Sequence, residues 1–326
     1  MTTNIIRRSV LLGSMAMAVS LGATAQPPYP SHPVRLIVPY APGGSTDGVA
    51  RIIGRAAEDL MKQSVVIDNR PGANTIVGTD FVARSKADGY TLILATNPHT
   101  SNPSLYASVP YDAEKDFSPI VYVGATPNVI AVNPKTGLKS LKALIEMAKA
   151  TPGKLDFATA GLGSVQHLSG AMLGLQAGVK FQHIPYKGGG PASADVLAGQ
   201  VPILISGLAA AMPFIKSNTL TALAVTSANR AAVLPDVPTV AESGFPGFES
   251  NYWFEVLAPR ATPRAVVDEL NRVFNAVLQL PAVRQQMADL GVDVTGGTVQ
   301  QAEEFLKDDT QKMSRLVKAT GIKLVE

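Results

Sequence analysis

The 326-residue sequence contains no cysteine, and this absence excludes several classes of protein at once. Thiol nucleophiles, disulfide frameworks, zinc ribbons and iron–sulfur clusters all require cysteine side chains. Membrane attachment through a lipid on an N-terminal cysteine is excluded for the same reason. Charge is also scarce, because only 16% of the residues are charged and no block of five like charges occurs. A disordered chain is therefore not expected.

The body of the sequence also lacks an apolar run long enough to span a membrane. The longest, residues 201–215, is interrupted by two prolines and a glycine. Residues 1–25 carry the three parts of a secretory signal: two adjacent arginines, an apolar stretch over 10–21 and an A-x-A cleavage site. We expect cleavage after Ala25 and an exported protein with no membrane anchor of its own. The residues around the arginines favour general secretion over the twin-arginine route.

A basic surface of the kind that binds nucleic acid is missing as well. Removing residues 1–25, which hold two arginines and no acidic residue, leaves 26 basic and 25 acidic side chains, a net charge of +1. Nucleic-acid-binding proteins usually carry a basic stripe, often with interleaved aromatic side chains, and no such stripe is visible. We therefore expect no nucleic-acid partner.

Apolar, β-branched runs alternate with segments of helical periodicity along the first part of the chain. Strands are predicted over 33–40, 64–67 and 90–96, with helices that start near Thr46 and Thr75 between them. This β-α-β-α-β order predicts parallel strands with right-handed crossovers.

Strand and helix patterns alternate again after a proline-rich stretch near residues 102–119. Further strands are predicted over 129–132, 155–159, 181–186, 201–206, 220–226 and 253–257, and helices over 140–149, 164–176, 192–198, 263–280, 282–290 and 299–320. The strand over 253–257 is expected to return to the first half. We predict an α/β clamshell of two lobes, 26–125 plus 250–326 and 126–249, with two chain crossings and a ligand cleft between the lobes.

Two loops of the same form give the strongest functional signal: a strand, small residues, two glycines, a serine and then a helix. They span residues 40–47 and 158–167. Glycine lets the backbone approach a ligand, and the N-terminus of the following helix presents unpaired N–H groups and a partial positive charge. One such loop on each lobe predicts a clamp for an anion. The candidate ligand-binding residues of the loops are Ala41, Pro42, Gly43, Gly44, Ser45, Thr46, Asp47, Thr159, Ala160, Gly161, Gly163, Ser164 and His167.

A carboxylate is the simplest anion for these loops. Neither loop has the lysine of a nucleotide-triphosphate site, and Gln166 stands where a dinucleotide site needs its third glycine. Two of the loop residues have an alternative role within the protein. Asp47 either balances the helix dipole or contacts the ligand, and His167 either donates to the ligand or packs in the protein.

Three further candidates lie outside the two loops. Asn97 and His99 follow a predicted strand that faces the cleft, and Tyr186 ends another strand beside a run of three glycines. The four histidines show no spacing typical of a metal site, and no G-x-S-x-G nucleophile elbow occurs. The sequence therefore predicts no metal, no cofactor and no catalytic residue.

Seven segments, in order along the chain, carry a family resemblance: 29–47, 68–73, 87–92, 163–168, 183–188, 234–239 and 242–247. Together they resemble the Bug family, the periplasmic solute receptors of tripartite tricarboxylate transporters. The resemblance implies a type II-like periplasmic binding protein fold that closes on a small ligand, usually a carboxylate. It also implies that loops 41–46 and 159–164 hold that ligand, partly through backbone groups and ordered water. The segment 97–102 departs from the family's glycine-rich pattern.

The sequence thus predicts a monomeric periplasmic receptor with no catalytic role. Its ligand would be a small di- or tricarboxylate, amino acid or aromatic acid, delivered to the membrane permease of a tripartite tricarboxylate-type secondary transporter. An exported binding protein without a lipid-bearing cysteine must be retained by an outer compartment, which points to the periplasm. Two alternatives stay open: a sensor subunit that presents ligand to a signalling receptor, and an enzyme on the same fold that uses His167 and Asp47.

Overall fold

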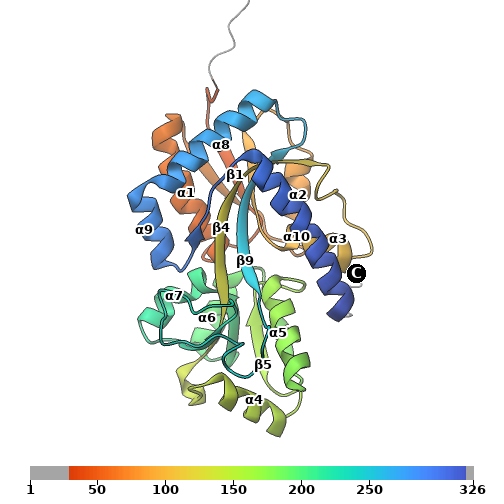
Figure 1. The fold of residues 1–326 in the computed structure, drawn as a ribbon, viewed down its shortest axis with the longest axis vertical. Helices are drawn as coiled ribbons and strands as arrows, with labels where there is room; N and C mark the ends of the chain where they lie inside the picture. Colours follow the sequence, from red (N-terminus) through yellow and green to blue (C-terminus); the bar gives the residue numbers. More distant parts are fainter. Residues whose placement is uncertain (1–28, 321–326) are drawn as a thin grey trace, which may run out of the picture.

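The computed structural model describes residues 29–320, and the predicted secretory segment, 1–25, lies outside them. The described residues form two lobes, one above the other in Figure 1, each with its own strands and helices. β4 (Phe117–Val132) runs from one lobe into the other, and the chain returns at β9 (Asn251–Pro259). The chain therefore crosses between the lobes twice, which confirms the predicted two-lobed α/β fold class.

The upper lobe in Figure 1 is built on a sheet with the strand order β2-β1-β3-β9-β4. Its other elements are β1 (Val34–Val38), α1 (Ser45–Met61), β2 (Val65–Asn69), α2 (Ile76–Ala83), β3 (Thr91–Ala95), α3 (Pro98–Leu105), α8 (Arg264–Gln279), α9 (Pro281–Asp289), β10 (Asp293–Val294) and α10 (Val299–Thr320). β1 pairs in parallel with β2 and β3, as predicted. β9 lies antiparallel to β3 and β4, so the chain returns to the first lobe as expected.

Helices cover both faces of this sheet, which explains the nearly continuous apolar runs of its strands. Leu36 and Leu94 pack with α1 and α8 on one face, whereas Ile37 and Ile93 pack with α2 and α10 on the other. Successive side chains of a strand point to opposite faces, so a sheet buried on both sides needs an apolar residue at almost every position.

The lower lobe continues the sheet in the order β4-β7-β5-β6, with β8 also paired to β4. Its elements are η1 (Pro134–Thr136), α4 (Leu141–Ala150), β5 (Asp156–Thr159), α5 (Val165–Ala177), β6 (Gln182–Pro185), α6 (Gly189–Ala198), β7 (Ile203–Gly207), α7 (Leu208–Lys216) and β8 (Thr221–Val225). Ile203 and Ile205 pack with α4 and α5, and Leu204 packs with α6 and α7 on the opposite face. Each lobe therefore consists of a sheet between two layers of helices.

Asn97 follows the end of β3 by two residues, as the sequence predicts, but His99 lies in α3, a helix that the sequence did not predict. Pro98 occupies the first turn of α3, where its missing N–H costs nothing. The helix is held by a contact distant in sequence, since the Thr100 hydroxyl donates to the Asp309 carboxylate of α10 at 2.6 Å. No local pattern could reveal that contact.

The sequence pattern also did not predict a helix over 208–216, where the structure has α7. Pro213 lies inside this helix. α7 begins directly at the end of β7, just as α1, α5 and α6 follow closely on β1, β5 and β6. The N-termini of these four helices consequently come to the junction between the lobes, where the ends of their strands meet (Figure 1).

Candidate ligand-binding site

A small cavity lies at the junction, where the N-termini of the four helices meet. Its lining residues come from both lobes: Tyr40, Gly44, Ser45, Thr46, Ala160, Gln166, Gly189, Ser206, Gly207 and Tyr252. Its volume is about 10 Å³, close to the minimum that holds one water molecule. The lobes are therefore closed on each other in this structure.

Backbone groups of the four helices make the cavity suitable for an anion. Three of the helices, α1, α6 and α7, have glycine N-caps (Gly44, Gly188 and Gly207), which lack a side chain that could occupy the first N–H groups. The fourth, α5, is capped by Ser164, whose hydroxyl accepts the N–H of His167 at 3.2 Å. Helix N-termini carry partial positive charge, so their convergence favours a negatively charged ligand.

No side chain that lines the cavity carries a charge at neutral pH. Burial, the largest effect, raises the pKa of both Tyr40 and Tyr252, so the two phenols stay neutral. The Tyr252 hydroxyl lies 2.7 Å from the Thr46 hydroxyl, and the Tyr40 hydroxyl lies 3.0 Å from that of Thr96. An anion would therefore be held by N–H and O–H groups and not by an ion pair.

The two lobes touch through main-chain atoms beside the cavity. The Ala41 N–H donates to the Lys187 carbonyl at 3.0 Å. A side chain on Gly44 would begin 3.3 Å from the nitrogen of Gly189, and one on Gly190 would overlap the carbonyl oxygen of Pro42. Glycine at these positions therefore permits the close approach of the lobes.

Ser45 connects the two lobes through its side chain beside the cavity. It belongs to α1, yet its hydroxyl accepts the N–H of Ala210 in α7 at 3.1 Å. The same hydroxyl donates to the carbonyl of Gly207 at 3.3 Å. Ser45 thus satisfies a free N–H in the first turn of a helix in the opposite lobe, and this bond exists only while the lobes are together.

Asp47 does not line the cavity, and its carboxylate is occupied within its own lobe. It accepts the Gly43 N–H and an Asn69 amide N–H at 3.0 Å each, and it accepts two bonds from Arg51 at 2.9 and 3.0 Å. Burial raises the pKa of Asp47, but the bonds and charge of these partners outweigh it and lower the pKa below its ordinary value. Asp47 therefore fixes the glycine loop in position.

The second predicted loop is stabilised in a similar way, by hydrogen bonds to two histidine side chains. The Thr159 hydroxyl lies 2.7 Å from Nε2 of His183, and the Gly163 N–H donates to Nδ1 of His167 at 3.1 Å. The two imidazole rings stack 4.0 Å apart. Burial lowers the pKa of His167 to about 4, and burial with the neighbouring His167 lowers that of His183 to about 3. Both rings are neutral and face a separate surface pocket in the lower lobe.

Asn97, His99 and Tyr186 also lie outside the cavity. The Asn97 amide bonds the backbone of β9, donating to the Asn251 carbonyl at 3.2 Å. His99 donates to the Ala113 carbonyl at 2.8 Å, and burial lowers its pKa to about 4. The Tyr186 hydroxyl donates to Asp195 at 2.6 Å; burial and then that carboxylate raise its pKa to about 12.

Only four of the sixteen predicted residues line the cavity: Gly44, Ser45, Thr46 and Ala160. The other predicted loop residues, Ala41, Pro42, Gly43, Asp47, Thr159, Gly161, Gly163, Ser164 and His167, surround these four and shape the loops. Sequence reasoning missed Tyr40, Gln166, Gly189, Ser206, Gly207 and Tyr252 as site residues. Ser206 ends a predicted strand and Gly207 follows it, so the strand-end argument that selected the two loops applied to them as well.

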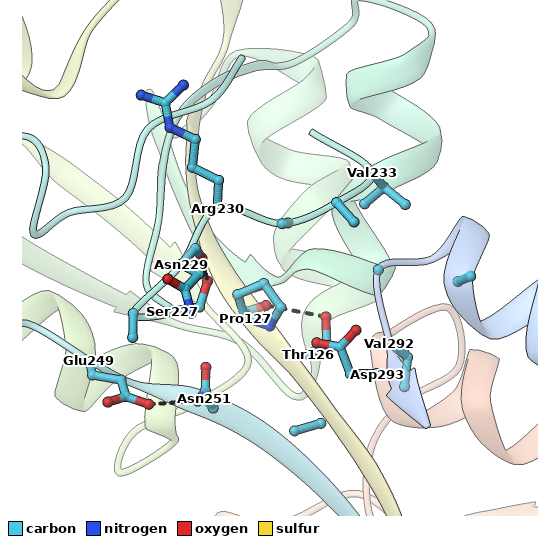
Figure 2. A pocket seen from close by; sticks show the side chains of 16 residues that line it. Thr126, Pro127, Ser227, Asn229, Arg230, Val233, Glu249, Asn251, Val292 and Asp293 are labelled. Atoms are coloured by element: carbon cyan, nitrogen blue, oxygen red, sulfur yellow. Dashed lines mark hydrogen bonds between the residues drawn. The ribbon is translucent and has the colours of Figure 1, made fainter. Parts of the chain in front are cut away.

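A larger cavity, of about 380 Å³, lies against β4 and β9 where they pass between the lobes (Figure 2). It is lined by the carboxylates of Glu249 and Asp293, and Figure 2 shows Arg230 extending away from both. Arg230 is paired with Glu242 at 2.9 Å. Neither of these two carboxylates forms an ion pair with another residue of 29–320, so their charge disfavours a carboxylate ligand, and the cavity between the helix N-termini is the better candidate.

Residues 29–320 contain no group of three or more histidine, aspartate or glutamate side chains placed to hold a metal ion. None of the helices in this part of the chain is both long and apolar enough to cross a membrane.

A family model, a related sequence and a solved structure all place this chain among the same receptors. A family model for the tripartite tricarboxylate transporter family receptor matches residues 49–322. BugT of Bordetella pertussis is 40% identical over 324 residues, which cover 98% of this chain and 99% of BugT. The periplasmic binding protein BugD is similar in structure, with a TM-score of 0.88 and 35% identity over 91% of this chain and 100% of BugD.

Two other solved structures contain a ligand. Rpa4515 of R. palustris, with adipate, has a TM-score of 0.88 and 34% identity, and the match covers 90% of this chain and 99% of that one. MatC from Rhodopseudomonas palustris, with bound malate, has a TM-score of 0.84 and 29% identity, covering 89% of this chain and all of MatC.

Proposed function

Because the chain belongs to the tripartite tricarboxylate transporter receptor family, whose structurally similar members are periplasmic binding proteins, we propose that it captures a small carboxylate between its lobes. Adipate in Rpa4515 and malate in MatC give the chemical class of the ligand. The observation that carries the proposal is the convergence of four helix N-termini, from both lobes, on a cavity lined by uncharged donors. A carboxylate accepts N–H and O–H groups and gains from the helix dipoles.

Lobe closure is the second part of the proposal. The lobes correspond to residues 26–125 plus 250–326 and 126–249. The carboxylate first contacts the α1 loop of the open form, and closure then brings α5, α6 and α7 to it. Ligand binding shifts the population toward the closed form because the closed form makes more contacts with the ligand.

Family membership supports the location and the partner that we propose. Cleavage after Ala25 releases the mature chain into the periplasm, where it acts as a monomer. It delivers its ligand to the membrane permease of a tripartite tricarboxylate-type transporter, and the permease recognises the closed surface. No catalytic step is part of this proposal, so the acid should leave the protein unchanged.

A thermal-shift screen of residues 26–326 against mono-, di-, tri- and aromatic carboxylates and amino acids tests the carboxylate proposal. A ligand at 100 times its dissociation constant adds about 2.7 kcal/mol to the free energy of unfolding. For a protein of this size the melting temperature should rise by about 5 °C. The proposal is wrong if no acid changes the melting temperature and mass spectrometry finds no acid in the purified protein. Conversion of a bound acid to a product, followed by NMR, would instead indicate an enzyme.

Ser45→Ala tests the contribution of the bond between the lobes. The variant loses the hydroxyl that accepts the Ala210 N–H, which exists only in the closed form. A hydrogen bond of this kind contributes about 1 kcal/mol, so we expect the dissociation constant of the ligand, measured by calorimetry, to rise about fivefold. Ser85→Ala is the matched control, because its hydroxyl bonds the Phe81 carbonyl within one lobe. Equal affinities of the two variants would remove Ser45 from the closure mechanism.

A further inference from the structure

Gln166 has a hydrogen-bond acceptor for which no other residue of 29–320 offers a donor. The residue lines the cavity between the helix N-termini and is 2% exposed. Its Oε1 is buried and has no hydrogen-bond partner among the residues that the structure describes. Buried polar atoms in folded proteins are almost always paired, so an unpaired one beside a ligand cavity needs an explanation.

The orientation of this side-chain amide is set by a relay of hydrogen bonds. Nε2 of Gln166 donates to Oδ1 of Asn128 at 3.0 Å. Nδ2 of Asn128 in turn donates to the main-chain carbonyl of Ser250 at 3.3 Å. A carbonyl can only accept, which fixes the Asn128 amide and, through it, the Gln166 amide. Oε1 of Gln166 therefore remains an acceptor.

The relay is anchored where the chain passes between the lobes. Asn128 belongs to β4 and is completely buried, and Ser250 directly precedes β9. Thr226 bonds both of them: its hydroxyl accepts the Asn128 N–H at 2.9 Å and donates to the Ser250 carbonyl. Gln166 is thus held in place by strands of the lobe junction and cannot turn its N–H groups toward the cavity without breaking the relay.

Gln166 is the second residue of α5, and it lines the same cavity as the first-turn N–H groups that we assign to the carboxylate. We propose that the ligand carries a hydrogen-bond donor on the carbon next to that carboxylate, and that Oε1 of Gln166 accepts it. This inference rests on the carboxylate function proposed above and narrows the ligand to 2-hydroxy or 2-amino carboxylates. A hydroxyl and an ammonium group supply the same donor chemistry, so the test must separate them.

Three matched series of acids make the test: propionate, lactate and alanine; succinate, malate and aspartate; glutarate, 2-hydroxyglutarate and glutamate. Within a series the members differ at the 2-position by a hydrogen, a hydroxyl or an ammonium group. Calorimetry on residues 26–326 should show the hydroxy or the amino member binding at least tenfold more tightly than the unsubstituted one, because a site built around a donor rejects the analogue that lacks it. The stronger of the two members identifies the donor.

Gln166→Met removes the acceptor and preserves the approximate size of the side chain, and we expect it to bring the affinity ratio within a series close to one. Ser169→Ala is the control on the same helix, since its hydroxyl bonds the Val165 carbonyl and the Ser250 hydroxyl but takes no part in the relay. It should keep the wild-type ratio. Circular dichroism checks that both variants fold.

The possible failures are distinguishable. If a water molecule donates to Oε1 instead, the wild-type protein should bind all three acids of each series equally well. This result would overturn the inference and leave the carboxylate proposal intact. The inference would also be overturned if Gln166→Met kept the wild-type ratio of affinities between the substituted and unsubstituted acids. It would be overturned as well if none of the nine acids bound while the wider screen found another carboxylate. If no carboxylate of any kind binds, the proposed function itself fails.

Discussion

Gly190→Ala is expected to hold the lobes apart and to weaken carboxylate binding at least tenfold. The added methyl group would overlap the carbonyl oxygen of Pro42 in the other lobe and lie 3.2 Å from the carbonyl carbon of Gly43. The clash exists only when the lobes meet. Gly190 lies in α6 and its φ is not in the left-handed region, so alanine suits the backbone and even favours the helix. Calorimetry measures the affinity, and small-angle X-ray scattering measures whether ligand makes the protein more compact.

Gly48→Ala is the control for this experiment. It also places a methyl group in a helix, α1, but that group would meet only a Leu290 methyl, at 4.0 Å and within the same lobe. This variant should bind ligand and become compact like the wild-type protein. A Gly190→Ala protein that binds with unchanged affinity and still contracts would show that the lobes need not meet at this point.

Ser206→Asp is expected to weaken binding of any carboxylate about 100-fold at neutral pH. Ser206 lines the cavity from β7 and is 3% exposed, so an aspartate there would place a negative charge among the N–H groups that receive the ligand. Juxtaposed like charges in a poorly solvated site cost several kcal/mol. The loss should diminish as the pH falls, because protonation of the new carboxyl removes its charge.

Ser206→Asn separates charge from size. Asparagine has nearly the shape of aspartate, so the difference in dissociation constant between the two variants reports the charge alone. If both variants lose affinity equally and neither loss depends on pH, the cavity does not bind an anion at this position. A large difference that closes at low pH supports the carboxylate proposal.

Much of the fold could be predicted because its cause is local. The strands that begin at Val34, Thr91 and Ile203 are nearly continuous apolar runs, as sheets covered on both faces require. α3 and α7 were missed because their stability comes from distant segments. The Thr100 hydroxyl reaches Asp309 of α10, and Ser45 of the other lobe completes the first turn of α7.

The candidate site could be predicted only in part, for a different reason. The two glycine loops indicated helix N-termini, and four of their residues do line the cavity. The polar side chains in those loops looked like ligand contacts, yet Asp47 and His167 bond to their own loops. Sequence distinguishes polar from apolar residues but cannot tell a side chain that supports a loop from one that meets a ligand.

The α/β class and the two lobes follow from the sequence alone, as does the resemblance to the Bug family, which the family model and BugT confirm. Each depends on patterns within short stretches of chain. The fold brings the four helix N-termini together at a cavity that Gln166 lines, and it leaves Oε1 of Gln166 without a partner among the described residues. Neither fact follows from the sequence. Every residue except proline has a main-chain N–H group, so the sequence cannot show which N–H groups will meet at a cavity. A side-chain acceptor is free for a ligand only when no neighbouring residue in the fold donates to it, and those neighbours are not known from the sequence.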